Sequence, residues 1–273
     1  MEPIFSESYI DPIFQPASPT GYVKRDMQAH PVGAFAPPAN IPLVDLAALP
    51  GIIREQEEKK SRLSDVLRRQ GIPSLNQNDP NRPRKWGYCW CYGTVGAVVA
   101  LRALNGEPYV NLTGFPNAFT MMNGADQGAW GGKSLEHIGK YGIPPDSHWP
   151  EFDTKMRPMS DPCWTEALKY KVTDGFMEMA DPEYDRDFSK HQTLSLLAAR
   201  VPVVADMDDW GHCTYWCDVV DCYPNRSATD LSRYGIRGRN SWGDSWGDIG
   251  FYIRKDRYST PDNAVAPLIV PAW

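Results

Sequence analysis

The chain has 273 residues, enough for one large domain or two small ones. Its content of 42% hydrophobic and 23% charged residues is that of a globular protein with an ample core. The net charge of −6 argues against nucleic acid as a partner, because nucleic-acid binders are usually basic. No apolar run approaches the roughly 18 residues needed to span a membrane.

The first 50 residues contain many prolines and no clear helical or strand periodicity. They are expected to form an extended arm, held either against its own domain or against an assembly partner. The start of the chain lacks the basic and apolar regions of a secretory signal, so we expect a cytoplasmic protein or a component of an assembly such as a virion. The spacing of the six cysteines fits no familiar disulfide pattern, which favours free thiols.

Helices are predicted before strands along the chain. A charged helix over residues 52–70 ends before Gly71, a residue type common at helix C-termini. A longer apolar helix is expected over residues 89–105, and shorter ones over residues 130–141 and 165–170. Strands are expected over residues 201–205, 213–220, 234–239 and 250–254. This order predicts an α+β architecture.

Three chemically active side chains lie at the ends of these elements. Cys89 opens the apolar helix, where the positive end of the helix dipole favours a thiolate. His212 directly precedes a strand, and Asn240 directly follows one. A thiolate nucleophile needs a histidine within hydrogen-bond reach, and an asparagine can orient the imidazole ring. Taken alone, Cys89 would better fit an inert thiol in the core.

A zinc site is the competing interpretation of the histidine region. His212, Cys213, Cys217 and Cys222 lie close in sequence. However, the segment contains no C-x-x-C pair, in which two residues separate the cysteines, as zinc sites usually have. Small buried thiols on a strand explain these residues better. We therefore expect no metal and no cofactor.

The motifs around these residues resemble those of the papain-like cysteine proteases, in a bacterial or phage-type form. Residues 240–252 read N-S-W-G-x-x-W-G-x-x-G-F-Y, residues 89–97 read C-W-C-Y-G-T-V-G-A, and Gly211-His212 lies between them. His212 follows Cys89 by 123 residues and Asn240 follows it by 151, close to the family spacing of roughly 130–150. The resemblance covers about residues 76–255.

The resemblance implies a papain-like fold of two lobes with a cleft between them. The helical left lobe would carry the nucleophile helix, and the right lobe would be rich in strands. Residues 76–273 would form the peptidase domain, preceded by the proline-rich arm and charged helix of residues 1–75. The implied activity is that of a cysteine peptidase, which hydrolyses peptide bonds through a Cys-His-Asn triad and a thioester intermediate. Cys89, His212 and Asn240 would form that triad, with Trp242 shielding the His–Asn bond from water.

A further segment resembles the substrate-binding region of bacterial members. Residues 126–130 read D-Q-G-A-W, and are followed by Tyr141-Gly142-Ile143 and Trp149-Pro150. In the family, a glycine in this loop pairs its backbone with an extended peptide. Gly128 is the candidate for that role, although it could equally serve only the turn before the helix. Trp90 and Trp242 are the other candidates for contact with a peptide or protein substrate.

The oxyanion hole departs from the family pattern. The family places a glutamine six residues before the nucleophile, but this position is Pro83, which has no donor. Gln77 is the nearest candidate, with about six additional residues between it and Cys89. Losing one oxyanion donor costs on the order of 10²–10³ in rate. The alternative is therefore a weak or inactive papain-fold structural or binding component of a larger assembly such as a phage virion. An amidase acting on cell-wall peptides, or a transpeptidase, is the third possibility.

Overall fold

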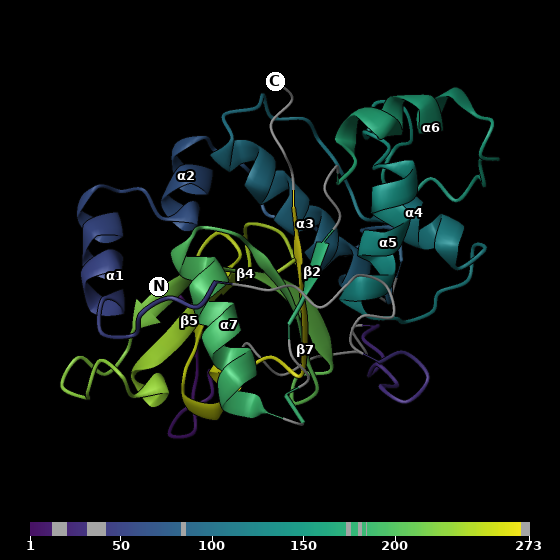
Figure 1. Ribbon diagram of the computed structural model, residues 1–273. Coiled ribbons are helices and arrows are strands. Elements are labelled where there is room, and N and C mark those ends of the chain that lie inside the picture. The colour runs from purple at the N-terminus through teal and green to yellow at the C-terminus, as the bar shows by residue number, and fades with distance from the viewer. Residues whose placement is uncertain are drawn as a thin grey trace.

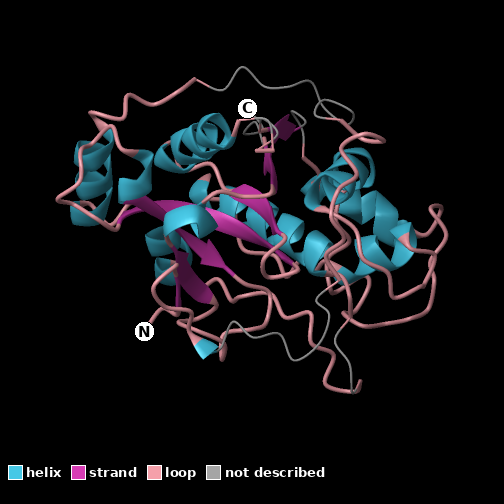
Figure 2. Cartoon of the chain, turned by 90° about the horizontal axis from the view of Figure 1, so that it is seen from below, coloured by secondary structure: helices cyan, strands magenta, loops and turns pink. Residues whose placement is uncertain are grey.

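The computed structural model describes residues 1–12, 21–31, 42–82, 86–172, 176–179, 182–183 and 185–268. These residues form a group of helices beside a twisted sheet, with further helices against the sheet (Figure 1). Seen from below, the sheet lies among the helices, and one helical group stands to its side (Figure 2). No helix of the described residues is both long and apolar enough to cross a membrane. The combination of these helices with a sheet makes the molecule α+β, as predicted.

The described strands form one seven-stranded sheet in the order β1-β6-β5-β4-β3-β7-β2. Neighbouring strands are antiparallel, except that β1 pairs with β6 in parallel. The strands are β1 (Ile4–Phe5), β2 (Phe176–Glu178), β3 (Val203–Met207), β4 (His212–Asp221), β5 (Tyr234–Arg239), β6 (Phe251–Arg254) and β7 (Asn263–Pro267). The first eight residues of β4 are buried, because helices cover this central strand on both faces. The four predicted strands correspond to β3, β4, β5 and β6.

The helices agree with the prediction in part. They are α1 (Leu49–Glu58), α2 (Leu63–Arg69), α3 (Cys89–Leu104), α4 (Phe115–Met121), α5 (Gly131–Tyr141), α6 (Pro162–Ala167) and α7 (Arg186–Ala198). The helices expected over residues 89–105 and 130–141 are confirmed. The prediction of a single helix over residues 52–70 is wrong. The chain turns at Lys60, whose φ of 50° is left-handed, and this turn divides the region into α1 and α2. Helix α7 was not predicted, although its N-cap Asp185 accepts a hydrogen bond from the Phe188 N–H.

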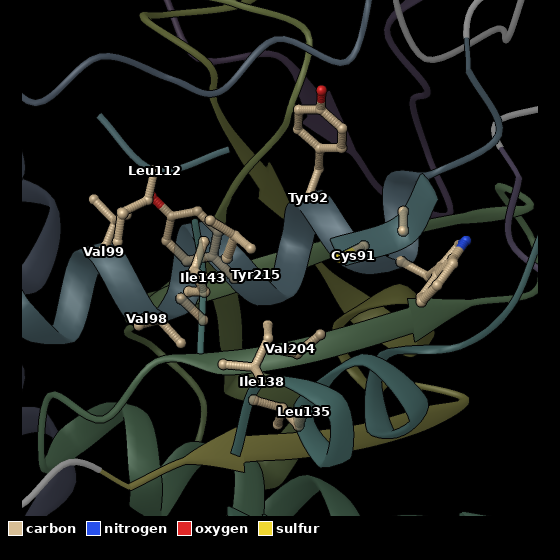
Figure 3. Packing of buried hydrophobic residues seen from close by; sticks show 14 of the residues in the cluster. Cys91, Tyr92, Val98, Val99, Leu112, Leu135, Ile138, Ile143, Val204 and Tyr215 are labelled. Atoms are coloured by element: carbon tan, nitrogen blue, oxygen red, sulfur yellow. The ribbon is translucent and has the colours of Figure 1, made fainter. Parts of the chain in front are cut away.

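Helix α3 packs between the helical lobe and the sheet, and 14 of its 16 residues are buried. Two glycines allow it to approach β4 closely. A Cβ atom on Gly93 would lie 3.1 Å from the Thr214 backbone, and one on Gly96 would lie 2.6 Å from the Tyr215 ring. Val98 and Val99 of this helix, together with Tyr215, belong to the apolar cluster drawn in Figure 3. This contact holds the start of α3 beside the start of β4.

Residues before position 76 contribute to the β-rich lobe. Ile4 pairs with Ile253 of β6, and the Glu2 carboxylate accepts a hydrogen bond of 3.1 Å from Arg237. On the far side of the sheet from α3, Leu49 and Ile53 of α1 join a second apolar cluster, to which α7 also contributes. The domain boundary at residue 76 stays a prediction, but in the structure the described residues before it supply β1 and α1 to this lobe, while α2 packs with α3.

Candidate active site

Cys89 is the first residue of α3 and is fully buried. The segment just before it is held by two hydrogen bonds. The Gly87 N–H donates to Asp126 Oδ1 at 2.6 Å, and the Gly87 carbonyl accepts from Trp90 Nε1 at 3.1 Å. Asp126 therefore ties the approach to the nucleophile helix to the loop that precedes α5. The thiol lies at the positive end of the helix dipole, which favours the thiolate form.

His212 is the first residue of β4, and its ring is hydrogen-bonded to Asn240. His212 Nε2 lies 2.7 Å from Asn240 Oδ1, and the same oxygen accepts the Ser241 N–H at 2.8 Å. The second bond fixes the amide so that its oxygen faces the imidazole. An amide oxygen can only accept, so Nε2 must carry a proton. Nδ1 is then the ring nitrogen that can exchange a proton with another group.

Tryptophan rings enclose the bond between His212 and Asn240. The His212 ring centroid lies 4.9 Å from that of Trp242 and 4.7 Å from that of Trp210. Trp246 packs against both tryptophans, at 5.6 Å from Trp242 and 6.0 Å from Trp210. His212 is fully buried and Asn240 almost so. In this low-dielectric surrounding their hydrogen bond is stronger than it would be in water.

The structure brings the cysteine and histidine segments together. Gly93, one turn into α3, abuts the backbone of Thr214, two residues after His212. Burial raises the pKa of the neighbouring Cys213 thiol well above its ordinary value, and the charges of Asp206 and Cys89 add to the shift. The three predicted residues come from the start of α3, the start of β4 and the end of β5.

Gln77 reaches the same region despite the additional residues that follow it. Its side chain is fully buried, with Nε2 donating to the Trp86 carbonyl at 3.1 Å and Oε1 accepting from Ser241 Oγ at 2.7 Å. Its backbone N–H also donates to the Ser241 carbonyl at 2.9 Å. Gln77 thus links the segment before the nucleophile helix to the segment that carries Asn240. Pro83, at the family's usual position for this residue, lies outside the described residues.

The loop before α5 pairs with another part of the chain, but through the residue after Gly128. The Ala129 N–H donates to the Gly21 carbonyl at 3.1 Å, and the Ala129 carbonyl accepts the Val23 N–H at 3.0 Å. Gly128 allows this close approach, because a Cβ atom there would lie 2.2 Å from the Gly21 oxygen. The role of Gly128 toward a substrate stays a prediction. The D-Q-G-A-W motif includes Ala129, but no periodicity or motif in the sequence indicated the segment that pairs with it.

The two tryptophans predicted to contact substrate differ in position. Trp242 lies at the edge of the site, over the His212 ring. Trp90 is fully buried among the apolar residues that surround α3, and its contact with a substrate stays a prediction. Its carbonyl accepts hydrogen bonds from Thr94 and Ser134, which fit a packing role. Ser241 was not predicted as a site residue, although it stands inside the N-S-W-G motif.

The thiols and carboxylates of the described residues do not form a metal centre. All six cysteines are free, and no three His, Cys, Asp or Glu side chains of the described chain are grouped to hold a metal ion. The cysteines of β4 instead lie among its buried residues, where Cys217 Sγ contacts the Arg237 carbonyl at 3.3 Å.

Comparison with known proteins gives different results for sequence and for structure. No protein-family model matches the sequence, and no curated protein matches it. Solved structures share its fold. Xylellain, a cysteine protease from Xylella fastidiosa, has a TM-score of 0.52 at 18% identity, over 73% of this chain and 83% of that chain.

Two eukaryotic structures give similar scores. The proform of the ragweed pollen cysteine protease Amb a 11 has a TM-score of 0.54 at 15% identity, over 91% of this chain and 71% of that chain. Procathepsin L 3 from the larval midgut of Tenebrio molitor has a TM-score of 0.51 at 15% identity, over 82% of this chain and 90% of that chain. The assignment to a bacterial or phage type stays a prediction. The helical lobe, the β-rich lobe and these likenesses show that the chain has the fold of the papain-like cysteine proteases.

Proposed function

We propose that this protein is a cysteine peptidase that hydrolyses peptide bonds through Cys89, His212 and Asn240. The observation that carries the proposal is the buried 2.7 Å bond between His212 Nε2 and Asn240 Oδ1. Because the Ser241 N–H fixes the amide oxygen, the imidazole is held in one tautomer and one orientation. In this orientation Nδ1 is the ring nitrogen proposed to serve Cys89, which begins the helix packed against β4.

The reaction follows from this orientation. His212 Nδ1 takes the proton of the Cys89 thiol, which gives a thiolate and an imidazolium. The thiolate attacks the peptide carbonyl carbon, and Nδ1–H then protonates the leaving amine as the C–N bond breaks. A water molecule attacks the resulting thioester and gives its proton to His212. The carboxylic acid product leaves, and Cys89 recovers its proton.

Gln77 and the backbone N–H of Cys89 are the proposed oxyanion donors. Ser241 Oγ donates to Gln77 Oε1, which leaves the amide nitrogen as the group that faces the nucleophile segment. That nitrogen has two hydrogens, and the Trp86 carbonyl accepts one of them. The same amide nitrogen is the proposed side-chain donor to the oxyanion. The insertion after Gln77 therefore does not remove this residue from the proposed machinery.

The proposed substrate is an extended peptide or protein segment. The backbone edge at Ala129 offers one donor and one acceptor in the spacing of a strand, which suits the addition of a peptide as a further strand. Gly128 leaves room for such a segment, and Trp242 borders the site beside His212. The chemistry requires no metal and no cofactor.

Intact-mass analysis after treatment with a peptidyl epoxide tests the nucleophile. We expect a single adduct at Cys89 of the wild type, together with cleavage of a peptide reporter, and neither in Cys89→Ala. Cys222→Ala is the matched control, since Cys222 is a partly exposed free thiol away from the site, and its removal should change neither readout. Circular dichroism would verify that both variants fold.

Two results would contradict the proposal. Undiminished turnover by folded Cys89→Ala would show that another group is the nucleophile. The absence of an adduct and of turnover in the folded wild type with Cys89 reduced would favour a structural or binding role for the fold.

A further inference from the structure

The indole of Trp210 meets the His212 imidazole from a different direction than Trp242 does. The Trp210 and His212 ring centroids are 4.7 Å apart with 73° between the ring planes, whereas Trp242 lies at 4.9 Å and 33°. One ring therefore stands steeply against the imidazole, and the other lies closer to parallel with it. The hydrogen bond to Asn240 holds the imidazole only at Nε2. Contacts from two directions also fix the tilt of the ring plane.

Other aromatic rings hold Trp210 in place. Its centroid lies 5.6 Å from that of Trp242, 6.0 Å from that of Trp246 and 5.5 Å from that of Tyr252. Tyr252 is in turn fixed to β4 through a hydrogen bond between its hydroxyl and Thr214 Oγ1. Trp210 is only 4% exposed, and dense packing of this kind leaves a ring little freedom to move.

The turn that carries Trp210 is fixed by an ion pair to β6. Arg254 Nη2 lies 2.6 Å from Asp209 Oδ1 and 2.7 Å from Asp209 Oδ2, and Arg254 Nε donates to the Tyr258 carbonyl at 2.6 Å. The Arg254 side chain is fully buried. Such a pair specifies one position of the chain, because separating it would leave a buried guanidinium without its counter-charge. The residue directly before Trp210 is therefore anchored.

Hydrogen bonds of backbone N–H groups fix the rest of this turn between β3 and β4. The Asp208 N–H donates to Asp262 Oδ2 at 2.8 Å, and the Gly211 N–H donates to the Asp208 carbonyl at 3.2 Å. Gly211 has a φ of +59°, which glycine adopts without strain, and His212 follows it as the first residue of β4. The turn thus places two side chains that are two positions apart, the indole and the imidazole, against each other.

We propose that Trp210 is a positioning residue for the catalytic histidine, held against it by the ion pair of Asp209 with Arg254. It acts through the imidazole and takes no part in making or breaking bonds. By blocking rotation of the ring, it keeps Nε2–H on Asn240 and Nδ1 directed toward the nucleophile while the imidazole gains and loses a proton. The inference rests on the proposed peptidase function.

Two readouts separate positioning from simple packing. The first is the rate at which the His212 Nε2 proton exchanges with solvent, measured by NMR on isotope-labelled protein, and it needs no turnover. The second is kcat and KM for a peptide reporter, determined separately, because loss of orientation lowers kcat whereas loss of a substrate contact raises KM. Urea denaturation of each variant verifies that it is folded under the assay conditions.

Trp210→Leu removes the ring, and Trp210→Phe keeps one. Trp164→Leu is the matched control, because Trp164 is also 4% exposed and also packs against a histidine, His137, at 5.8 Å, but in the helical lobe. We expect Trp210→Leu to speed exchange of the Nε2 proton by about tenfold or more. It should lower kcat by about 10–100-fold with little change in KM. Trp210→Phe should lie close to the wild type, and Trp164→Leu should match it in both readouts.

The double variant Asp209→Asn with Arg254→Met tests the anchor and leaves no buried unpaired charge. Its control is Asp221→Asn with Arg233→Met, because Arg233 Nη2 also lies 2.6 Å from its carboxylate, at the far end of β4 from the histidine. We expect the first double variant to show both effects of Trp210→Leu to a smaller extent, since the ring remains but its turn is released. The second should show neither effect.

The inference and the proposed function fail in different ways. An unchanged kcat in folded Trp210→Leu would overturn the inference, and so would a lower kcat without faster exchange of the Nε2 proton. Equal losses in Trp164→Leu would also overturn it, because they would show a general effect of stability. No turnover and no Cys89 adduct in the wild type would overturn the proposed function, while the exchange rates would still decide whether Trp210 holds the imidazole.

Discussion

Ser241 connects the two halves of the candidate site through a single side chain. Its N–H orients Asn240, and its hydroxyl orients Gln77. The proposed oxyanion donor Gln77 and Asn240, whose amide oxygen is bonded to His212, are therefore both held by Ser241. This connection explains how the additional residues after Gln77 are tolerated, because the position of Gln77 is set by contact with residue 241 and not by its distance along the chain from Cys89.

Removal of the Gln77 side chain tests its proposed role. We expect Gln77→Ala to lower kcat/KM for a peptide reporter by roughly 10²–10³, because one oxyanion donor is lost. Gln70→Ala is the matched control: Gln70 is a glutamine whose amide binds the Ala103 carbonyl away from the site, and its loss should leave kcat/KM unchanged. Equal kcat/KM values for Gln77→Ala and the wild type would exclude Gln77 from the oxyanion hole.

At the scale of elements, the contact between α3 and β4 places the nucleophile segment beside the histidine segment. The helix can lie this close because Gly96 faces the Tyr215 ring and Gly93 faces the Thr214 backbone. Glycine weakens a helix by roughly 1 kcal/mol relative to alanine, so its presence twice in a buried helix has a packing reason.

A larger residue at Gly96 should separate the two elements. We expect Gly96→Val to lower the free energy of unfolding by roughly 1–3 kcal/mol, because the added methyl groups overpack the contact with Tyr215. Gly51→Val is the control, since Gly51 is an exposed helical glycine whose Cβ would meet no atom within 4 Å; its effect should stay within about 0.5 kcal/mol. Urea denaturation measures both. Equal stabilities of the two variants would show that the contact can relax.

Helix α7 shows why some elements escaped prediction. Its buried residues include Ser189, Lys190, Gln192, Thr193 and Ser195, so the helix has no apolar stripe of helical period. These polar groups are bound within the fold, as where Lys190 Nζ donates to Ser259 Oγ at 2.8 Å. Burial lowers the Lys190 pKa to about 8. The partners come from distant segments, which a local pattern cannot reveal.

At the scale of the whole molecule, Asp206 makes the free energy of unfolding depend on pH. It is buried in β3, accepts a hydrogen bond of 2.7 Å from Asn263, and has a pKa raised to about 6, chiefly by burial. Hydrogen bonds from Asn263 and Cys213 and the charge of Arg25 oppose the shift. The folded protein therefore holds a proton that the unfolded chain releases near its ordinary pKa of 3.8.

Stability should consequently fall as pH rises from about 4 to about 6, and this contribution should be constant above that range. The expected loss is about 2–3 kcal/mol, from the size of the shift. Asp206→Asn removes the titration, so its free energy of unfolding relative to the wild type should increase between pH 4 and pH 7. Urea denaturation of both proteins at the two pH values measures this difference. An identical pH dependence of the two proteins would contradict the assignment.

The sequence by itself determined the candidate triad and the elements that carry it. Cys89, His212 and Asn240 stand in local motifs, and each adjoins a helix or strand whose apolar residues repeat over short distances. The fold class followed from the order of those elements. Such signals are local, so they can be read before any contact between distant residues is known.

Only the tertiary structure decided which residues meet around the triad. Gln77 is bound to Ser241, 164 positions away, and Tyr22 to Asp208, 186 positions away. The backbone groups that pair with Gly21 and Val23 belong to Ala129, more than 100 positions away along the chain, and no local pattern gives this register. These pairings depend on the packing of the two lobes, in which long-range burial and charge pairing, rather than local propensity, select the partner.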